Sequence, residues 1–143
     1  MANSKPFVAA ACVCEKVLQE KDDVASLMRI VDTFTLQAVN LPPGFEPMVS
    51  LTVFVSVKSG DVTGQHEIGL VLRSPDGKRH DVRKWPVVLN GGEHGAHLVL
   101  NFNLTKPKMG LYWFDVVWGE DNLTSIPFRL KQAEPTDQEP TTV

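Results

Sequence analysis

Residues 110–118, with the sequence GLYWFDVVW, decide the fold class. A glycine two residues before a tyrosine indicates a tight turn, and the aromatic and β-branched residues that follow favour a central strand of an antiparallel sandwich. Side chains alternate between the two faces of a strand, so Tyr112, Phe114 and Trp118 share one face. Trp113 points to the opposite face. We therefore expect Phe114 in a core and Trp113 nearer the surface.

Seven further segments carry strand patterns. Residues 48–57 are the clearest, because five aliphatic side chains alternate with Ser50, Thr52, Phe54 and Ser56, and this pattern predicts a half-buried strand. The other expected strands are residues 7–14, 27–36, 66–73, 79–85, 96–104 and 123–130. About eight short strands with turn signals roughly every 8–12 residues are typical of an all-β sandwich or a small barrel.

The expected connections follow from turn chemistry. Proline and glycine break strands and helices, and polar residues favour turns. On this basis we expect a polar turn or single helical turn at residues 15–23, a proline-rich loop at 41–47, a type I turn at 74–77 and a glycine-rich loop at 90–95.

The spacing Gly110-x-Tyr112 ahead of an alternating strand resembles the tyrosine corner of immunoglobulin-like sandwiches, in which the tyrosine hydroxyl bonds to an upstream backbone group. The resemblance implies an immunoglobulin-like antiparallel β-sandwich with that bond in the turn at residues 105–109. It gives structural roles to Gly110, Tyr112, Phe114 and Trp118. The cysteine and tryptophan pattern of antibody domains is missing, because both cysteines lie on the first strand.

A second resemblance covers most of the chain. It is carried by VCEKV at 13–17, QEK at 19–21, RIVD at 29–32, PDGK at 75–78, GLYWF at 110–114 and SIPF at 125–128. Together these segments resemble a family of short bacterial proteins of unknown function with an immunoglobulin-like β-sandwich. The resemblance implies a fold and assigns no catalytic residue.

Composition sets the domain organisation. The 143 residues, 43% of them hydrophobic, suffice for one domain with its own core, which we place at residues 1–131. Residues 132–143 are acidic and contain two prolines, so we expect a flexible, disordered tail. A net charge of −3 predicts no attraction to nucleic acid or to a membrane.

Two observations favour a cytoplasmic protein. The apolar run that ends at Cys12 is shorter than the roughly 7–15 residues of a secretory signal core. Cys12 and Cys14 are two residues apart on one strand, which suits free thiols better than a disulfide.

Motifs for catalysis are weak throughout. The glycines at 91–92 lack the lysine and the helix of a phosphate-binding loop, and no G-x-S-x-G motif occurs. His66, His94 and His97, with His80 and the two cysteines, are candidate zinc ligands, but their spacing matches no zinc motif. The basic residues at 78–85 are interrupted by acidic ones and divide between two strand faces. We expect no metal, no cofactor and no nucleic-acid binding.

The remaining hypothesis is a non-enzymatic interaction or structural module that binds a protein partner or a second copy of itself. Open sandwiches leave strand edges that are either protected or used. The candidate interaction surface comprises exposed aromatic and basic residues, namely Phe54, Trp85, Trp113, Arg79 and Arg83. The alternative is a small metal- or ligand-binding enzyme that uses the histidine-containing loops.

Overall fold

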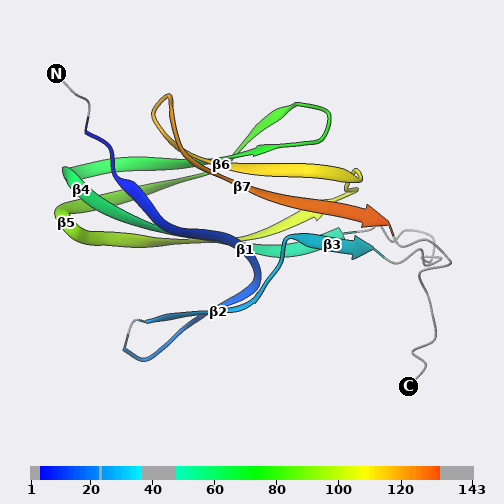
Figure 1. Ribbon diagram of the computed structural model, residues 1–143, viewed down its shortest axis with the longest axis horizontal. Coiled ribbons are helices and arrows are strands. Elements are labelled where there is room, and N and C mark those ends of the chain that lie inside the picture. Colours follow the sequence, from blue (N-terminus) through cyan, green and yellow to red (C-terminus); the bar gives the residue numbers. More distant parts are fainter. Residues whose placement is uncertain (1–3, 23, 37–47, 133–143) are drawn as a thin grey trace.

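The computed structural model describes residues 4–22, 24–36 and 48–132. These residues form seven β-strands and no helix (Figure 1). The strands are β1 (Phe7–Gln19), β2 (Ala25–Ile30), β3 (Thr33–Leu36), β4 (Met48–Arg73), β5 (Arg79–Thr105), β6 (Gly110–Trp118) and β7 (Asp121–Gln132). The predicted loop at 41–47 and nearly all of the predicted tail lie outside the described residues.

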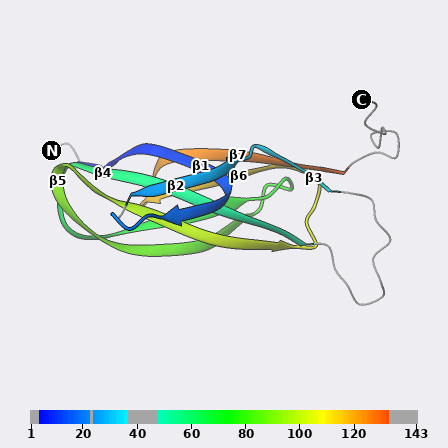
Figure 2. The ribbon, with the colours of Figure 1, turned by 90° about the horizontal axis from the view of Figure 1, so that it is seen from below.

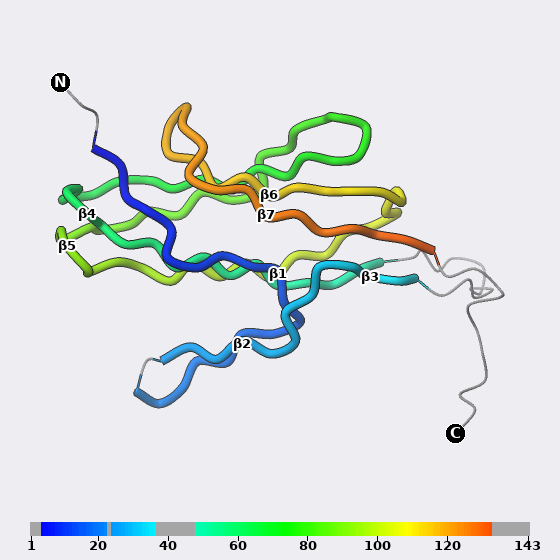
Figure 3. Tube along the Cα trace, in the orientation of Figure 1, coloured from blue at the N-terminus to red at the C-terminus, as the bar shows by residue number. Residues whose placement is uncertain are grey.

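A long hairpin made of β4 and β5 organises the fold. The two strands are antiparallel along their whole length, yet both turn back on themselves at the same end of the molecule (Figure 3). At the bend Gly60 pairs with Gly92, and both have positive φ, which glycine adopts at little cost. A Cβ atom at Gly95 would overlap the Val57 carbonyl oxygen, so the strands approach there more closely than any other residue allows.

The bend divides the sheet into two layers, which Figure 1 shows one above the other. Layer A contains β2, β1, the first half of β4 and the second half of β5. Figure 2 shows the molecule from below, which is the side on which layer A lies. Layer B contains the first half of β5, the second half of β4, β6, β7 and β3, with β3 parallel to β7. Because hydrogen bonding continues through the bend, the layers are one sheet curled on itself.

The core lies between the layers and is centred on aromatic rings. Phe114 is fully buried and stacks on Phe128 at a centroid distance of 5.3 Å, while Tyr112 stacks on the other side of Phe128 at 5.0 Å. Trp113 points away from this cluster and is only half-buried. The predicted placement of Phe114 and Trp113 is confirmed.

The tyrosine corner is present. The Tyr112 hydroxyl donates a hydrogen bond to the Lys108 carbonyl oxygen at 2.8 Å and accepts one from the Lys108 backbone nitrogen at 3.0 Å. Lys108 lies in the turn where the sequence predicts the bond. Gly110 has φ 132° and lies so close to Pro75 that a side chain would meet the proline ring at 2.9 Å. This turn therefore requires glycine, and it directs Tyr112 back onto the chain.

Two predictions for the N-terminal strands are wrong. Residues 15–19 are not a turn, because β1 continues to Gln19 and forms a hairpin with β2. Residues 27–36 are not one strand: β2 ends at Ile30, next to Arg29 with its positive φ of 55°, and β3 begins at Thr33. Between them the Asp32 carbonyl oxygen accepts a hydrogen bond from the Arg129 nitrogen, which directs the chain toward β7.

The prediction of eight short strands is also corrected. Residues 48–57 and 66–73 are halves of β4, and residues 79–85 and 96–104 are halves of β5. The expected glycine loop at 90–95 belongs to β5, because its glycines form the bend and keep the pairing with β4. The class of the fold, an all-β antiparallel sandwich, is confirmed.

Residues 51–57 are buried on both faces, not on one as predicted, while Met48 and Ser50 are exposed. On the outer face of layer A, Thr52 Oγ1 lies 3.3 Å from the Glu15 carbonyl oxygen, and the Phe54 ring packs against the His97 ring at a centroid distance of 5.2 Å. Neighbouring strands on both sides, β1 and β5, supply this cover. The alternation of side chains assigns each residue to one face of the strand. It does not predict whether that face is covered by other side chains.

Candidate functional site: the free edge of β5

The aromatic part of the predicted interaction surface is largely buried. Phe54 is 5% exposed and Trp85 is 8% exposed. Trp85 faces Ile68 across the β4–β5 pair and therefore points into the core, while Phe54 lies under His97. The expectation that these two rings form a surface is wrong. Arg83 is exposed on β5.

Trp113 and Arg79 lie near an ion pair on the outer face of layer B. The Arg73 guanidinium lies over the Trp113 ring and donates two hydrogen bonds to the Asp115 carboxylate, from Nε at 2.6 Å and from Nη2 at 2.9 Å. Ser125 donates a third bond to Asp115 at 2.6 Å. Burial alone would raise the pKa of Asp115, but these hydrogen bonds, with the charges of Arg73 and Arg79, hold that pKa below its usual value. A carboxylate satisfied in this way holds strands together and has a structural role.

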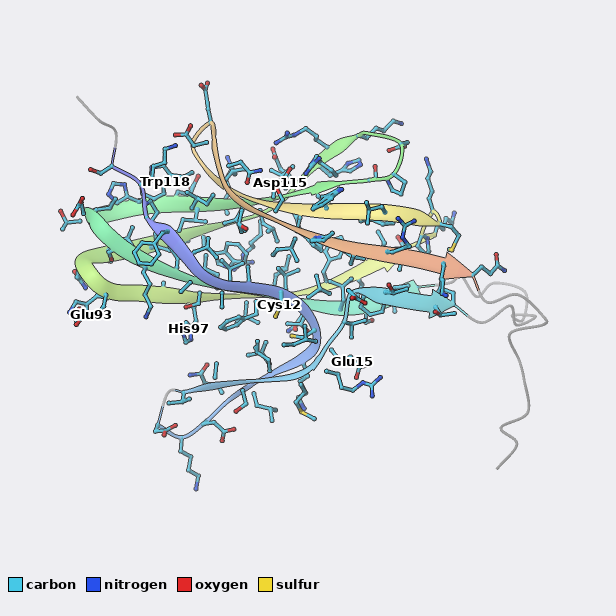
Figure 4. All side chains as sticks on the ribbon, viewed as in Figure 1. Cys12, Glu15, Glu93, His97, Asp115 and Trp118 are labelled. Atoms are coloured by element: carbon cyan, nitrogen blue, oxygen red, sulfur yellow. The ribbon has the colours of Figure 1, made fainter. Side chains whose placement is uncertain are left out.

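The three histidines of the alternative hypothesis lie in different surroundings. The His66 ring lies 4.8 Å from Trp118, beside an open groove of about 680 Å³ lined also by Glu67, Glu120 and Asp121. His97 packs on Phe54, while the backbone oxygen of His94 accepts a bond from Ser59. In Figure 4, Trp118 and His97 appear on opposite sides of the ribbon. Within residues 4–22, 24–36 and 48–132, no group of three or more His, Cys, Asp or Glu could hold a metal ion.

Both cysteines are free thiols, as predicted. Burial raises the pKa of each. The same described ranges contain no helix with the length and apolar character needed to cross a membrane.

The edge of β5 divides into two contrasting halves. Among the described strands β5 pairs only with β4, so its second edge is unpaired from end to end. We call residues 79–90, in layer B, the protected half. Its pairing with β4 shifts register between Leu70 and Val71, and Pro86 has no N–H group to donate to another strand. Its exposed charged residues are Arg79, Asp81, Arg83 and Lys84. Charges, proline and bulges are the features with which edge strands prevent pairing with another chain.

Residues 96–105, in layer A, have none of these features, and we call them the open half. Their sequence, AHLVLNFNLT, contains no Asp, Glu, Lys, Arg, Pro or Gly. Their pairing with β4 runs without a register shift from Ala96 opposite Val57 to Thr105 opposite Met48. Such a regular, uncharged edge is a template for another strand.

The side chains of the open half are incompletely covered on both faces. Leu100, Phe102 and Leu104 point toward the core but are only half-buried, and on the outer face Val99 is 38% exposed. The side-chain oxygens of Asn101 and Asn103 accept hydrogen bonds from Thr52 and Ser50 on β4. Their amide nitrogens have no partner among the described residues. The sequence predicts that a strand edge is the interaction site but names only His97 in the open half, as a candidate zinc ligand, because strand pairing alone defines which edge is unpaired.

The curled two-layer sheet and the tyrosine corner define the class: an immunoglobulin-like antiparallel β-sandwich. The chain belongs to a family of unknown function, DUF6941, whose sequence profile matches residues 9–131. No curated protein matches the sequence.

Solved structures with a similar arrangement include an immunoglobulin-like protein from Pseudomonas aeruginosa. It is 18% identical, the alignment covers 92% of this chain and 100% of that one, and the TM-score is 0.45. Two much longer proteins also align. The alkylpurine DNA glycosylase AlkC of Pseudomonas fluorescens is 10% identical over 91% of this chain and 31% of its own, with a TM-score of 0.47. A β-glucosidase from Listeria innocua is 14% identical over 92% of this chain and 17% of its own, with a TM-score of 0.46.

Proposed function

We propose that this protein is a non-enzymatic, cytoplasmic interaction module that binds an extended polypeptide strand along the open half of β5. The observation that carries the proposal is the contrast within one strand. Residues 79–90 have a bulge, a proline and four charged residues at the edge, whereas residues 96–105 present an uncharged, regular edge.

Strand addition gives affinity through the backbone. In an antiparallel pair about half of the N–H and C=O groups of each strand point to each side, so the open half offers several unpaired groups in register. Each hydrogen bond contributes roughly 0.5–1.5 kcal/mol net. An incoming strand would also cover the half-buried Leu100, Phe102 and Leu104, which adds a hydrophobic contribution.

Selectivity would come from the side chains on the two faces of the edge. On the core side the edge offers Leu100 and Phe102, which favour apolar neighbours across the new pair. On the outer side Asn101 and Asn103 have amide nitrogens available as donors. The expected ligand is therefore an alternating strand, apolar on one face and with hydrogen-bond acceptors on the other.

Site-specific photo-crosslinking tests the proposal. A photoreactive residue at Asn101, in the open half, is compared with one at Val88, an exposed valine in the protected half. We expect one defined protein adduct, identified by mass spectrometry, from position 101 and none from position 88.

A matched pair of lysine substitutions provides the control. Val99→Lys and Val88→Lys make the same change at exposed valines of the two halves, and a lysine on an edge strand opposes pairing. Val99→Lys should remove the adduct formed at position 101, and Val88→Lys should leave it intact. Equal crosslinking from both positions, or an adduct that survives Val99→Lys, would contradict the proposal.

A further inference from the structure

We propose that the strand bound by the open half is the same segment of a second copy of this chain, paired antiparallel and centred on Leu100. Layer A of one copy would then continue into layer A of the other as a single sheet about a two-fold axis. This inference rests on the proposed function, because it names the partner of the same edge.

The first argument is that the open half is complementary to itself. Directly opposed residues of an antiparallel pair point to the same face of the sheet. Centring on Leu100 places Leu98 opposite Phe102 and Ala96 opposite Leu104, all on the core side. On the outer side Val99 lies opposite Asn101, and His97 opposite Asn103. If one strand slides by a single residue, so that Leu100 opposes Asn101, apolar core-side residues are placed against polar outer-face ones.

The second argument concerns charge. Between Glu93 and Lys106 the strand carries no acidic residue, lysine or arginine, so two copies approach without repulsion along the paired segment. The two boundary residues have opposite charges. An antiparallel arrangement brings Lys106 of one copy toward Glu93 of the other, whereas a parallel arrangement would bring like charges together.

The third argument concerns the asparagine amides. The Asn103 oxygen is engaged by Ser50, and its amide nitrogen has no partner among the described residues. In the centred register this nitrogen faces the imidazole of His97 in the second copy, and a neutral imidazole has one nitrogen that accepts a hydrogen bond. The same contact occurs twice because of the two-fold symmetry.

Sedimentation of the purified full chain over a wide concentration range tests the inference. We expect a reversible monomer–dimer equilibrium. Val99→Lys should raise the dimer dissociation constant about tenfold or more, which corresponds to about 1.4 kcal/mol. Val88→Lys, in the protected half, should leave it unchanged. Thermal melts of both variants establish that each is folded.

A charge-rescue pair tests the register. In the centred register residue 99 faces residue 101 of the other copy, so Val99→Lys combined with Asn101→Glu forms two Lys–Glu pairs across the interface and should restore most of the lost affinity. Val99→Lys combined with His97→Glu has the same formal charge but places the acid opposite residue 103, so it should restore much less.

The outcomes separate the two proposals. A wild-type chain that stays monomeric at every concentration, or equal rescue by the two double variants, overturns the centred dimer. If the chain is monomeric while position 101 still crosslinks to a different protein, the edge-binding function stands and only the identity of the partner is wrong. If the chain is monomeric and position 101 gives no adduct, both proposals fail.

Discussion

The two halves of β5 share a strand and a neighbour, yet they present opposite kinds of edge. Residues 79–90 combine exposed charges with Pro86 and an irregular register, while residues 96–105 form an unbroken ladder without Asp, Glu, Lys or Arg. The glycines at the bend place the halves in different layers. Among the described strands both halves lack a second neighbour, so the contrast between them lies in side chains and backbone regularity.

The largest expected difference between the halves concerns their core-facing leucines. Leu89, in the protected half, is fully buried, and Leu100, in the open half, is half-buried. Leu89→Ala should cost about 2–5 kcal/mol of unfolding free energy because it leaves a cavity, and Leu100→Ala should cost clearly less in the monomer. Denaturant unfolding at low protein concentration measures both. Equal losses would mean that the open half is as well covered as the protected half.

The bend that separates the halves depends on its glycines. Gly95→Ala forces a methyl group against the Val57 carbonyl oxygen, so we expect a loss of about 3 kcal/mol, at the upper end of the range for overpacking. Gly92→Ala has open space around it and should cost only the roughly 1–2 kcal/mol of a left-handed backbone. Chemical denaturation compares the two variants. A larger loss of unfolding free energy in Gly92→Ala than in Gly95→Ala would show that the bend does not depend on the close approach of the strands at Gly95.

The ion pair beside the protected half predicts a dependence on pH. The pKa of Asp115 is lowered in the folded protein, so its contribution is present above the unfolded pKa of about 3.9 and is lost as the pH falls through the lower folded value. Asp115→Asn should cost about 1–3 kcal/mol at neutral pH, since Arg73 and Ser125 lose a charged acceptor. The difference in stability between wild type and variant should shrink below pH 4. A difference that stays constant into acid would show that the carboxylate charge contributes nothing.

The smallest expected effect concerns the tyrosine corner, which lies at the end of the sandwich where β5 leads into β6. Tyr112→Phe keeps the ring stacked on Phe128 and removes only the hydroxyl that bonds to Lys108. We expect a loss of about 0.5–1.5 kcal/mol with the fold unchanged. Coincident denaturation midpoints for the variant and wild type would show that the bond is energetically neutral.

Local sequence patterns predicted the elements better than their connections. Gly110-x-Tyr112 specifies a tight turn and a corner through residues that are neighbours in the chain, and both are found. Glycines at 90–95 are compatible with a loop or with a bend inside a strand, and only pairing with distant residues such as Gly60 decides between them. Local patterns therefore predict two short strands where the structure has one long strand.

The candidate site could not be predicted for a related reason. Alternation places Phe54 and Trp85 on definite faces of their strands, but burial depends on which elements cover those faces. The Arg73–Asp115 pair joins residues 42 positions apart, and no local pattern connects them. An edge is a property of the whole sheet order. Once that order is known, the sequence of residues 96–105 is sufficient to single out the open half.

Hydrogen exchange along β5 tests the central claim most directly. Amide exchange is measured by mass spectrometry for the full chain, free at low concentration and bound to its partner, whether a second copy or the protein crosslinked through position 101. The account predicts slower exchange on binding for peptides within residues 96–105, because their outward N–H groups become hydrogen-bonded, and no change within residues 79–90. Protection confined to residues 79–90, or spread equally over both halves, would contradict it.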